Sequence, residues 1–133
     1  MITTNISIIS SNPSHRPAII QMLEAAILPA TDLPSDLSNF FIAVEGKKVI
    51  GVIGLEIYGD HALLRSLAVD QAYRNQNIAE QLLLQVEDRA RQLKLSAIYL
   101  LTETARGYFE KKGFETIQRE EVPPALKQSS EFS

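Results

Sequence analysis

The chain has 133 residues, of which 45% are hydrophobic, and a formal net charge of −3. This length and hydrophobic content fit one compact domain, residues 1–133, around an apolar core, and they argue against a second domain. The sequence contains no cysteine, which excludes disulfides, thiolate metal sites and a cysteine nucleophile.

The sequence also gives expectations about location and partners. Its first residues lack the basic start and apolar run of a secretory signal, and its longest mostly apolar stretch, residues 49–57, is too short to cross a bilayer. We therefore expect a cytoplasmic protein with no membrane partner. The weak negative charge and scattered Lys and Arg residues predict no nucleic-acid partner. His15 and His61 lie far apart in sequence, so we expect no metal site.

The first half of the chain is predicted to form a strand, a helix and two hairpins. A strand at residues 5–9 precedes a helix at residues 15–27, which has Pro17 in its permissive first turn. The prolines and aspartates of LPATDLPSDL, residues 28–37, indicate a loop, and such loops often cover a binding site. Strands follow at residues 39–45, 48–58 and 61–69, joined by turns at Gly46-Lys47 and Gly59-Asp60.

The strand at residues 48–58 carries apolar side chains on both of its faces. Regular alternation places Leu55, Ile53 and Val49 on one face, and Val52 and Ile50 on the other. A sheet with one face in water would alternate apolar and polar residues instead. We therefore expect helices on both faces of the sheet.

The second half of the chain is predicted to alternate helices and strands. The clearest helix spans residues 77–93, and its apolar stripe consists of Ile78, Leu82, Leu83, Val86, Ala90 and Leu93. Three shorter elements follow, a strand at residues 96–101, a helix at 104–112 ended by Gly113, and a strand at 114–119.

A polar turn joins the strand at residues 61–69 to the helix at residues 77–93. The amides of a helix's first turn have no partner within the helix, and together with the helix dipole they favour a bound phosphate. The turn Arg74-Asn75-Gln76-Asn77 can therefore cradle a pyrophosphate. Asn tolerates left-handed backbone better than most residues, so Asn75 and Asn77 can form the bend.

This turn resembles the acyl-coenzyme A signature of the GNAT N-acetyltransferase superfamily. In that family it reads Arg or Gln, two variable residues, Gly, one variable residue, then Gly or Ala, which here falls on Arg74, Asn75, Gln76, Asn77, Ile78 and Ala79. Because Asn77 replaces the central glycine, which allows close approach to a ligand, we expect weakened but not abolished cofactor binding. The order of elements also matches the GNAT fold, a mixed α/β sheet with helices on both faces.

The resemblance implies how acetyl-coenzyme A would lie. In the family it enters where two parallel strands, the fourth and the fifth, splay apart. Its pantetheine arm would pair with main-chain groups around Leu67, Ala68 and Val69, and an amide there would face the oxyanion of the reaction. Thr102 stands where many members carry Asn, and it would either bond the pantetheine or cap the next helix. Ala105 occupies a small-residue position of the family.

The resemblance leaves the general acid open. Many GNAT enzymes protonate the departing thiolate with a tyrosine in a motif like Tyr-Glu-Lys-x-Gly-Phe, where this chain has FEKKGF. The tyrosine position is therefore Phe109, a cofactor contact, and Tyr108, about 100° around the helix, would serve as the acid only if the helix rotates. The loss is tolerable because a thiol of pKa about 8.5 leaves readily near neutrality, whereas an amine of pKa near 10 must first lose a proton.

Glu56 lies within an apolar strand, where an ionised carboxylate is costly unless it is paired or functional. If Gly59-Asp60 is a two-residue hairpin turn, Glu56 lies opposite Leu63 and diagonal to Arg65 on the same face. Glu56 would then be a base that takes the acceptor's proton, directly or through water, while Arg65 holds an acidic group of the acceptor. The alternative is a structural ion pair between the two, which would weaken Glu56 as a base.

The end of the chain departs from the family. GNAT proteins usually close with a seventh strand, whereas here Pro123 and Pro124 interrupt the tail and Ser133 ends it soon after Glu131 and Phe132. We therefore expect the last strand to be short or absent. Either the tail packs irregularly, or a second subunit covers the exposed sheet edge, which would make the protein a homodimer.

A closer resemblance is to a bacterial branch named for arsenic-resistance N-acetyltransferases. It is carried over about residues 28–132 by LPATDL, GLEIYGDHALLRSLAV, LLTETARGYFEKKGF and PPALKQSSEF. The resemblance implies direct transfer of acetyl from acetyl-coenzyme A to the primary amine of a small, amino-acid-like acceptor. The loop with Leu28 and Asp32 would lie over this acceptor. The alternative is a non-catalytic acyl-coenzyme A-binding or interaction module, motivated by the lost glycine, the lost tyrosine and the truncated end.

Overall fold

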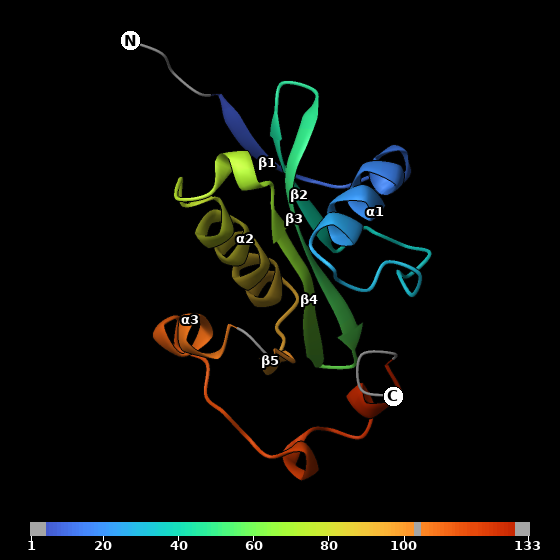
Figure 1. Cartoon of the computed structure of the whole chain (residues 1–133). Coiled ribbons are helices and arrows are strands. Elements are labelled where there is room, and N and C mark those ends of the chain that lie inside the picture. The colour runs from blue at the N-terminus through green and yellow to red at the C-terminus, as the bar shows by residue number, and fades with distance from the viewer. Residues whose placement is uncertain (1–4, 103–104, 130–133) are drawn as a thin grey trace.

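The computed structural model describes residues 5–102 and 105–129, which contain a five-stranded mixed sheet (Figure 1). The strands lie side by side in chain order. The first four pair antiparallel, and the fifth runs parallel to the fourth. Their bounds are β1 (Ile6–Ser10), β2 (Phe40–Glu45), β3 (Lys48–Tyr58), β4 (His61–Val69) and β5 (Ala97–Tyr99). The expected mixed sheet is confirmed.

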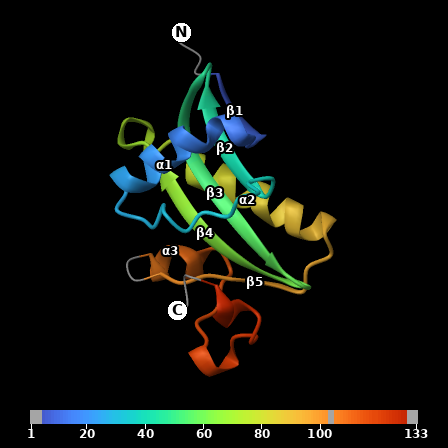
Figure 2. The same cartoon turned by 90° about the vertical axis from the view of Figure 1, so that its right-hand side faces the viewer.

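Helices cover both faces of this sheet, as expected from its apolar faces (Figures 1 and 2). On one face, α1 (Arg16–Ala25) buries Ile19 and Leu23 in a core that includes Phe40 of β2. On the other face, α2 (Ile78–Gln92) buries most of its apolar stripe in a second core. The short α3 (Arg106–Lys111) adds its buried phenylalanine to that second core. No helix among the described residues is long and apolar enough to span a membrane.

The alternation predicted for β3 is wrong at its first residues. Ala43 of β2 pairs with Gly51 and Val44 pairs with Val49, so Ile50 is an extra residue in β3. This bulge shifts the alternation by one position. As a result Ile50 is buried on the α2 face and Val49 packs on the α1 face, the reverse of the prediction.

Most predicted elements form within a few residues of their expected bounds, but the end of α2 and the length of the following strand differ from the prediction. Leu93 is 44% exposed, because α2 has already ended there and the following Lys94, with φ +57°, turns the chain away. The predicted strand at residues 96–101 is shortened to β5. The predicted start of the next helix, Thr104, lies outside the described residues.

The predicted strand at residues 114–119 does not form. Its Phe114 ring lies edge-on to the Phe109 ring, with the two ring centres 5.5 Å apart. The Thr116 hydroxyl donates to a Glu110 carboxylate oxygen at 3.4 Å. The segment is therefore fastened to α3 and not to β5. Beyond it, the tail makes two short 3-10 turns, and Val122 and Leu126 are buried against Leu63 of β4. In the described part the tail packs irregularly, which was one of the two alternatives.

Candidate functional site

The polar turn before α2 has left-handed backbone at two asparagines. After β4 the chain makes a 3-10 turn at Gln71–Tyr73, and then φ reaches +64° at Asn75 and +61° at Asn77. Asn77 is the N-cap residue of α2, but its side chain makes no capping hydrogen bond. Its backbone conformation, and not its side chain, therefore shapes the turn. The bend persists without the family's central glycine.

A cavity of about 440 Å³ opens at this end of α2. Its wall combines the last residues of β4 with the polar turn and the first turn of the helix. Of the predicted cofactor residues, it brings together Leu67, Ala68, Val69, Arg74, Asn75, Asn77, Ile78 and Ala79. Gln76, in the same turn, is exposed and does not line the cavity.

Three further residues line this cavity that the sequence interpretation missed, namely Tyr73, Glu80 and Lys112. None of them occupies a signature position. The sequence does contain a signal for Glu80, namely its place in the first turn of the predicted helix, next to the polar turn. An acidic residue there stabilises the helix but repels a bound anion. Tyr73 donates its hydroxyl to Glu45 at 2.6 Å, and this hydrogen bond raises the pKa of Tyr73.

The open side of β4 adjoins the same cavity. β4 pairs with β5 only through His61, Ala62 and Leu63, although β4 continues to Val69. β5 ends at Tyr99, so β4 continues past that point without it. A bulge also interrupts β4 at Ser66, where φ is +63°. Leu67, Ala68 and Val69 therefore line the cavity on a stretch of β4 that has no β5 partner among the described residues.

Tyr108 and Phe109 lie in different surroundings. Tyr108 lines the cavity at the start of α2, and its buried hydroxyl has no hydrogen-bond partner among the described residues. Phe109 is 7% exposed and belongs to the core between α2 and the sheet. The residue that reaches the cavity is therefore Tyr108, one position before the family's tyrosine.

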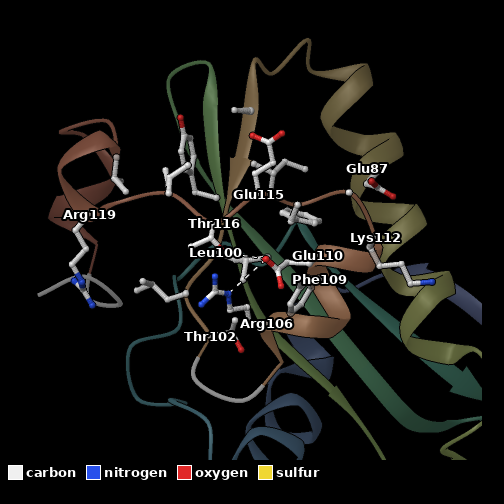
Figure 3. Close-up of a pocket in the computed structure, with 18 residues that line it drawn as sticks. Glu87, Leu100, Thr102, Arg106, Phe109, Glu110, Lys112, Glu115, Thr116 and Arg119 are labelled. Carbon is white, nitrogen blue, oxygen red and sulfur yellow. Dashed lines mark hydrogen bonds and ion pairs between the residues drawn. The ribbon is translucent and has the colours of Figure 1, made fainter.

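A second cavity, of about 780 Å³, lies between β5, α3 and residues 113–119 (Figure 3). It contains Phe109 and Thr102, so these two predicted cofactor residues are separated from the first cavity. The Thr102 hydroxyl oxygen accepts the N–H of Ala105 at 3.0 Å. Ala105 is itself the N-cap residue of α3 and has no side-chain cap, so this bond lies just before the helix. Ala105 packs at the edge of the core and lines neither cavity.

Arg65 and Glu56 meet as the hairpin register predicted. Glu56 pairs with Leu63 across the strands, and its Oε1 lies 3.0 Å from Arg65 Nη1. Arg65 also contacts the loop at residues 28–37, where its Nη2 lies 2.7 Å from Asp32 Oδ1. This loop crosses in front of the sheet in Figure 2. Leu28, at its start, packs on the core of the α1 face.

The guanidinium of Arg65 is buried and fully engaged. Its side chain is 0% exposed, against 21% for Asp32 and 16% for Glu56. Besides the two carboxylates, it donates to the carbonyls of Pro29 and Asp32 at 3.4 Å and to the Ser66 hydroxyl at 3.0 Å. Five acceptors match the five N–H donors of an arginine. Arg65 therefore fastens the loop to β3 and β4.

Glu56 is held from a second side. Its Oε2 accepts the hydroxyl of Tyr58 at 3.0 Å. Burial, followed by this hydrogen bond, raises the pKa of Tyr58, so the phenol stays neutral and keeps donating further into the alkaline range. Within the described residues, no group of three or more acidic or histidine side chains is arranged to hold a metal ion.

Comparisons with known proteins identify the family. Residues 12–114 match the family model described as the acetyltransferase (GNAT) family. Over 93 residues the chain is 27% identical to an amino-acid acetyltransferase of Aeromonas salmonicida, covering 68% of this chain and 21% of that protein. The chain thus spans about a fifth of that relative.

Solved structures show the same fold. An N-acetylglutamate synthase from Neisseria gonorrhoeae, complexed with coenzyme A and L-arginine, superposes with a TM-score of 0.81 at 23% identity, covering 91% of this chain and 30% of that one. A GNAT-family acetyltransferase from Staphylococcus aureus superposes with a TM-score of 0.79 at 24% identity, covering 92% of each chain. From the family match and the shared fold, the chain belongs to the acetyltransferase (GNAT) family.

Proposed function

We propose that this chain transfers an acetyl group from acetyl-coenzyme A to the primary amine of a small, amino-acid-like acceptor. The observation that carries the proposal is the cavity at the start of α2, which continues to the open edge of β4. The family match supports the reaction, and the names of the two amino-acid-acetylating relatives support the acceptor class.

The chemical groups that line the cavity suit the parts of acetyl-coenzyme A. Main-chain amides at the start of α2, with Arg74 beside them, suit a diphosphate. The main-chain groups of β4 around Leu67 suit the two amides of the pantetheine arm. When bound, the cofactor supplies an acetyl thioester. The protein's contribution is to hold this thioester beside the amine.

Two groups in the cavity are suited to the reacting atoms. A main-chain amide near Leu67 would donate to the carbonyl oxygen as negative charge develops there, and losing one such donor typically costs about 3 to 4 kcal/mol of barrier. The Tyr108 hydroxyl, buried and without a partner among the described residues, would donate its proton to the departing sulfur. No covalent intermediate with the enzyme is needed.

On the acceptor side, Glu56 has two competing roles, base or structural partner of Arg65. Its contacts support the structural role, because both carboxylate oxygens are engaged and it lines neither cavity. As a base it would act through a water molecule. The variant Glu56→Gln separates the two roles. Unchanged turnover at every pH would remove Glu56 from the proton path, whereas a loss of kcat confined to one limb of the pH profile would assign it there.

The acceptor is best sought by a thiol-release screen. The panel would contain amino acids, their phosphinic and arsenic analogues because of the branch resemblance, polyamines and peptides. Release of thiol with an amino acid or a close analogue is the expected result. Calorimetry with acetyl-coenzyme A is the companion measurement. Binding without thiol release across the whole panel would favour the alternative of a non-catalytic binding module, and absence of binding would contradict both functions.

A further inference from the structure

Lys112 lines both the cavity at the start of α2 and the second cavity, although it holds no signature position. It follows α3, and its Nζ lies 3.3 Å from Oε1 of Glu80, in the first turn of α2. The same Nζ lies 5.6 Å from the centre of the Tyr108 ring. Figure 3 shows Lys112 extending away from Glu110, on the side of α2. All three residues, Lys112, Glu80 and Tyr108, line the cavity.

The position of Glu80 explains why this ion pair matters. Its carboxylate stands beside the amides at which a diphosphate is expected to bind, and there a negative side chain repels a bound anion. In the free protein Lys112 offsets that charge. The pair is half-exposed, with side-chain exposures of 30% for Lys112 and 49% for Glu80, so it contributes little to stability and can exchange partners readily.

We propose that Lys112 binds the diphosphate of acetyl-coenzyme A, exchanging the Glu80 carboxylate for phosphate oxygens when the cofactor enters. This inference rests on the proposed function. Lysine is well suited to the task because its ammonium is a compact charge on a long, flexible stem. Arg74 in the turn and Lys112 beyond α3 then approach the helix start from two different elements.

The test compares three variants, Lys112→Met, Glu80→Gln and Lys111→Met. Lys111→Met is the matched control, because Lys111 is exposed, adjacent in sequence and lines neither cavity. Calorimetry gives the Kd for coenzyme A. We expect Lys112→Met to raise this Kd about tenfold, as for loss of one charge-assisted contact, and Lys111→Met to leave it unchanged. Glu80→Gln should lower it about threefold, because Lys112 is released and a repulsive charge is removed.

A second donor separates diphosphate binding from positioning of Tyr108. Acetyl-pantetheine carries the thioester but no diphosphate, so its kcat/KM should be the same in Lys112→Met and in the unchanged protein. An equal loss with both donors would overturn the inference, because Lys112 would then act through Tyr108. An unchanged Kd in Lys112→Met, or the same rise in Lys111→Met, would also overturn it. Failure of the unchanged protein to bind coenzyme A would instead refute the proposed function, and this inference with it.

Discussion

Replacing Asn77 tests whether the left-handed turn before α2 sets both stability and cofactor affinity. Left-handed backbone costs an ordinary residue roughly 1 to 2 kcal/mol, less for Asn and almost nothing for Gly. Because φ is +61° and the Asn77 side chain makes no capping bond, no side-chain interaction is lost on substitution. We expect Asn77→Ala to lower the free energy of unfolding by about 1 kcal/mol. The free energy of unfolding of Asn77→Gly should equal that of the natural chain or exceed it by up to about 1 kcal/mol.

Urea denaturation measures this difference, and thermal unfolding should show it as a shift of about 2 to 4 °C per kcal/mol. The matched control is Gln76→Gly in the same turn. Gln76 has no positive φ, so glycine there only adds freedom to the unfolded chain and should cost about 0.5 to 1 kcal/mol. Asn77→Gly should also lower the Kd for coenzyme A about threefold, since the backbone can then approach the phosphates more closely.

Two results would refute this reasoning. If Asn77→Ala proves as stable as Asn77→Gly, the left-handed conformation does not govern the turn. If Asn77→Gly is more stable but binds coenzyme A no better, the missing glycine does not limit the site, and its replacement by Asn77 has no cost for the cofactor.

Three further predictions concern the frame around the site. A Cβ on Gly54 would lie 2.4 Å from the Phe40 ring, so Gly54→Ala should lower the free energy of unfolding by about 1 to 3 kcal/mol. Gly107 lies in open space on α3, so Gly107→Ala should raise that free energy by up to about 1 kcal/mol. Denaturation measures both changes. Arg65→Met leaves the carboxylates of Asp32 and Glu56 without their cation and should lower the free energy of unfolding by about 3 to 5 kcal/mol. A loss below about 1 kcal/mol would show that Arg65 does not hold the loop to the sheet. The raised pKa of Tyr58 gives stability that is present below pH 10 and lost above it, so Tyr58→Phe should show a flatter alkaline limb of stability against pH.

The register of the β3–β4 hairpin could be predicted because local chemistry determines it. A two-residue turn at Gly59-Asp60 fixes Tyr58 opposite His61, and counting back along both strands places Glu56 beside Arg65. The left-handed bend before α2 is equally local, since Asn75 and Asn77 form it within one short turn. Predictions of this kind need only the chain's own periodicity and the geometry of one turn.

Other features depend on distant parts of the chain or on breaks in periodicity. The bulges at Ile50 and Ser66 interrupt a pattern that alternation assumes to be regular. Asp32 joins Arg65 across 33 residues of sequence, which no local pattern indicates. Whether Tyr108 or Phe109 reaches the cavity at the start of α2 depends on how α3 is rotated against the core. That rotation is set by the burial of Phe109 in the core of the α2 face, together with residues of α2 and the sheet.

The contacts of Arg65 bear on how an acceptor could be recognised. A free arginine would hold an acceptor's carboxylate, but here the guanidinium is buried and already satisfies five acceptors. An acceptor carboxylate would have to displace Asp32 or Glu56 and leave that carboxylate without its cation. The three side chains together carry a net negative charge, which attracts an ammonium group and repels an acid. Arg65 is therefore better suited to hold the loop at residues 28–37 over the sheet than to bind the acceptor itself.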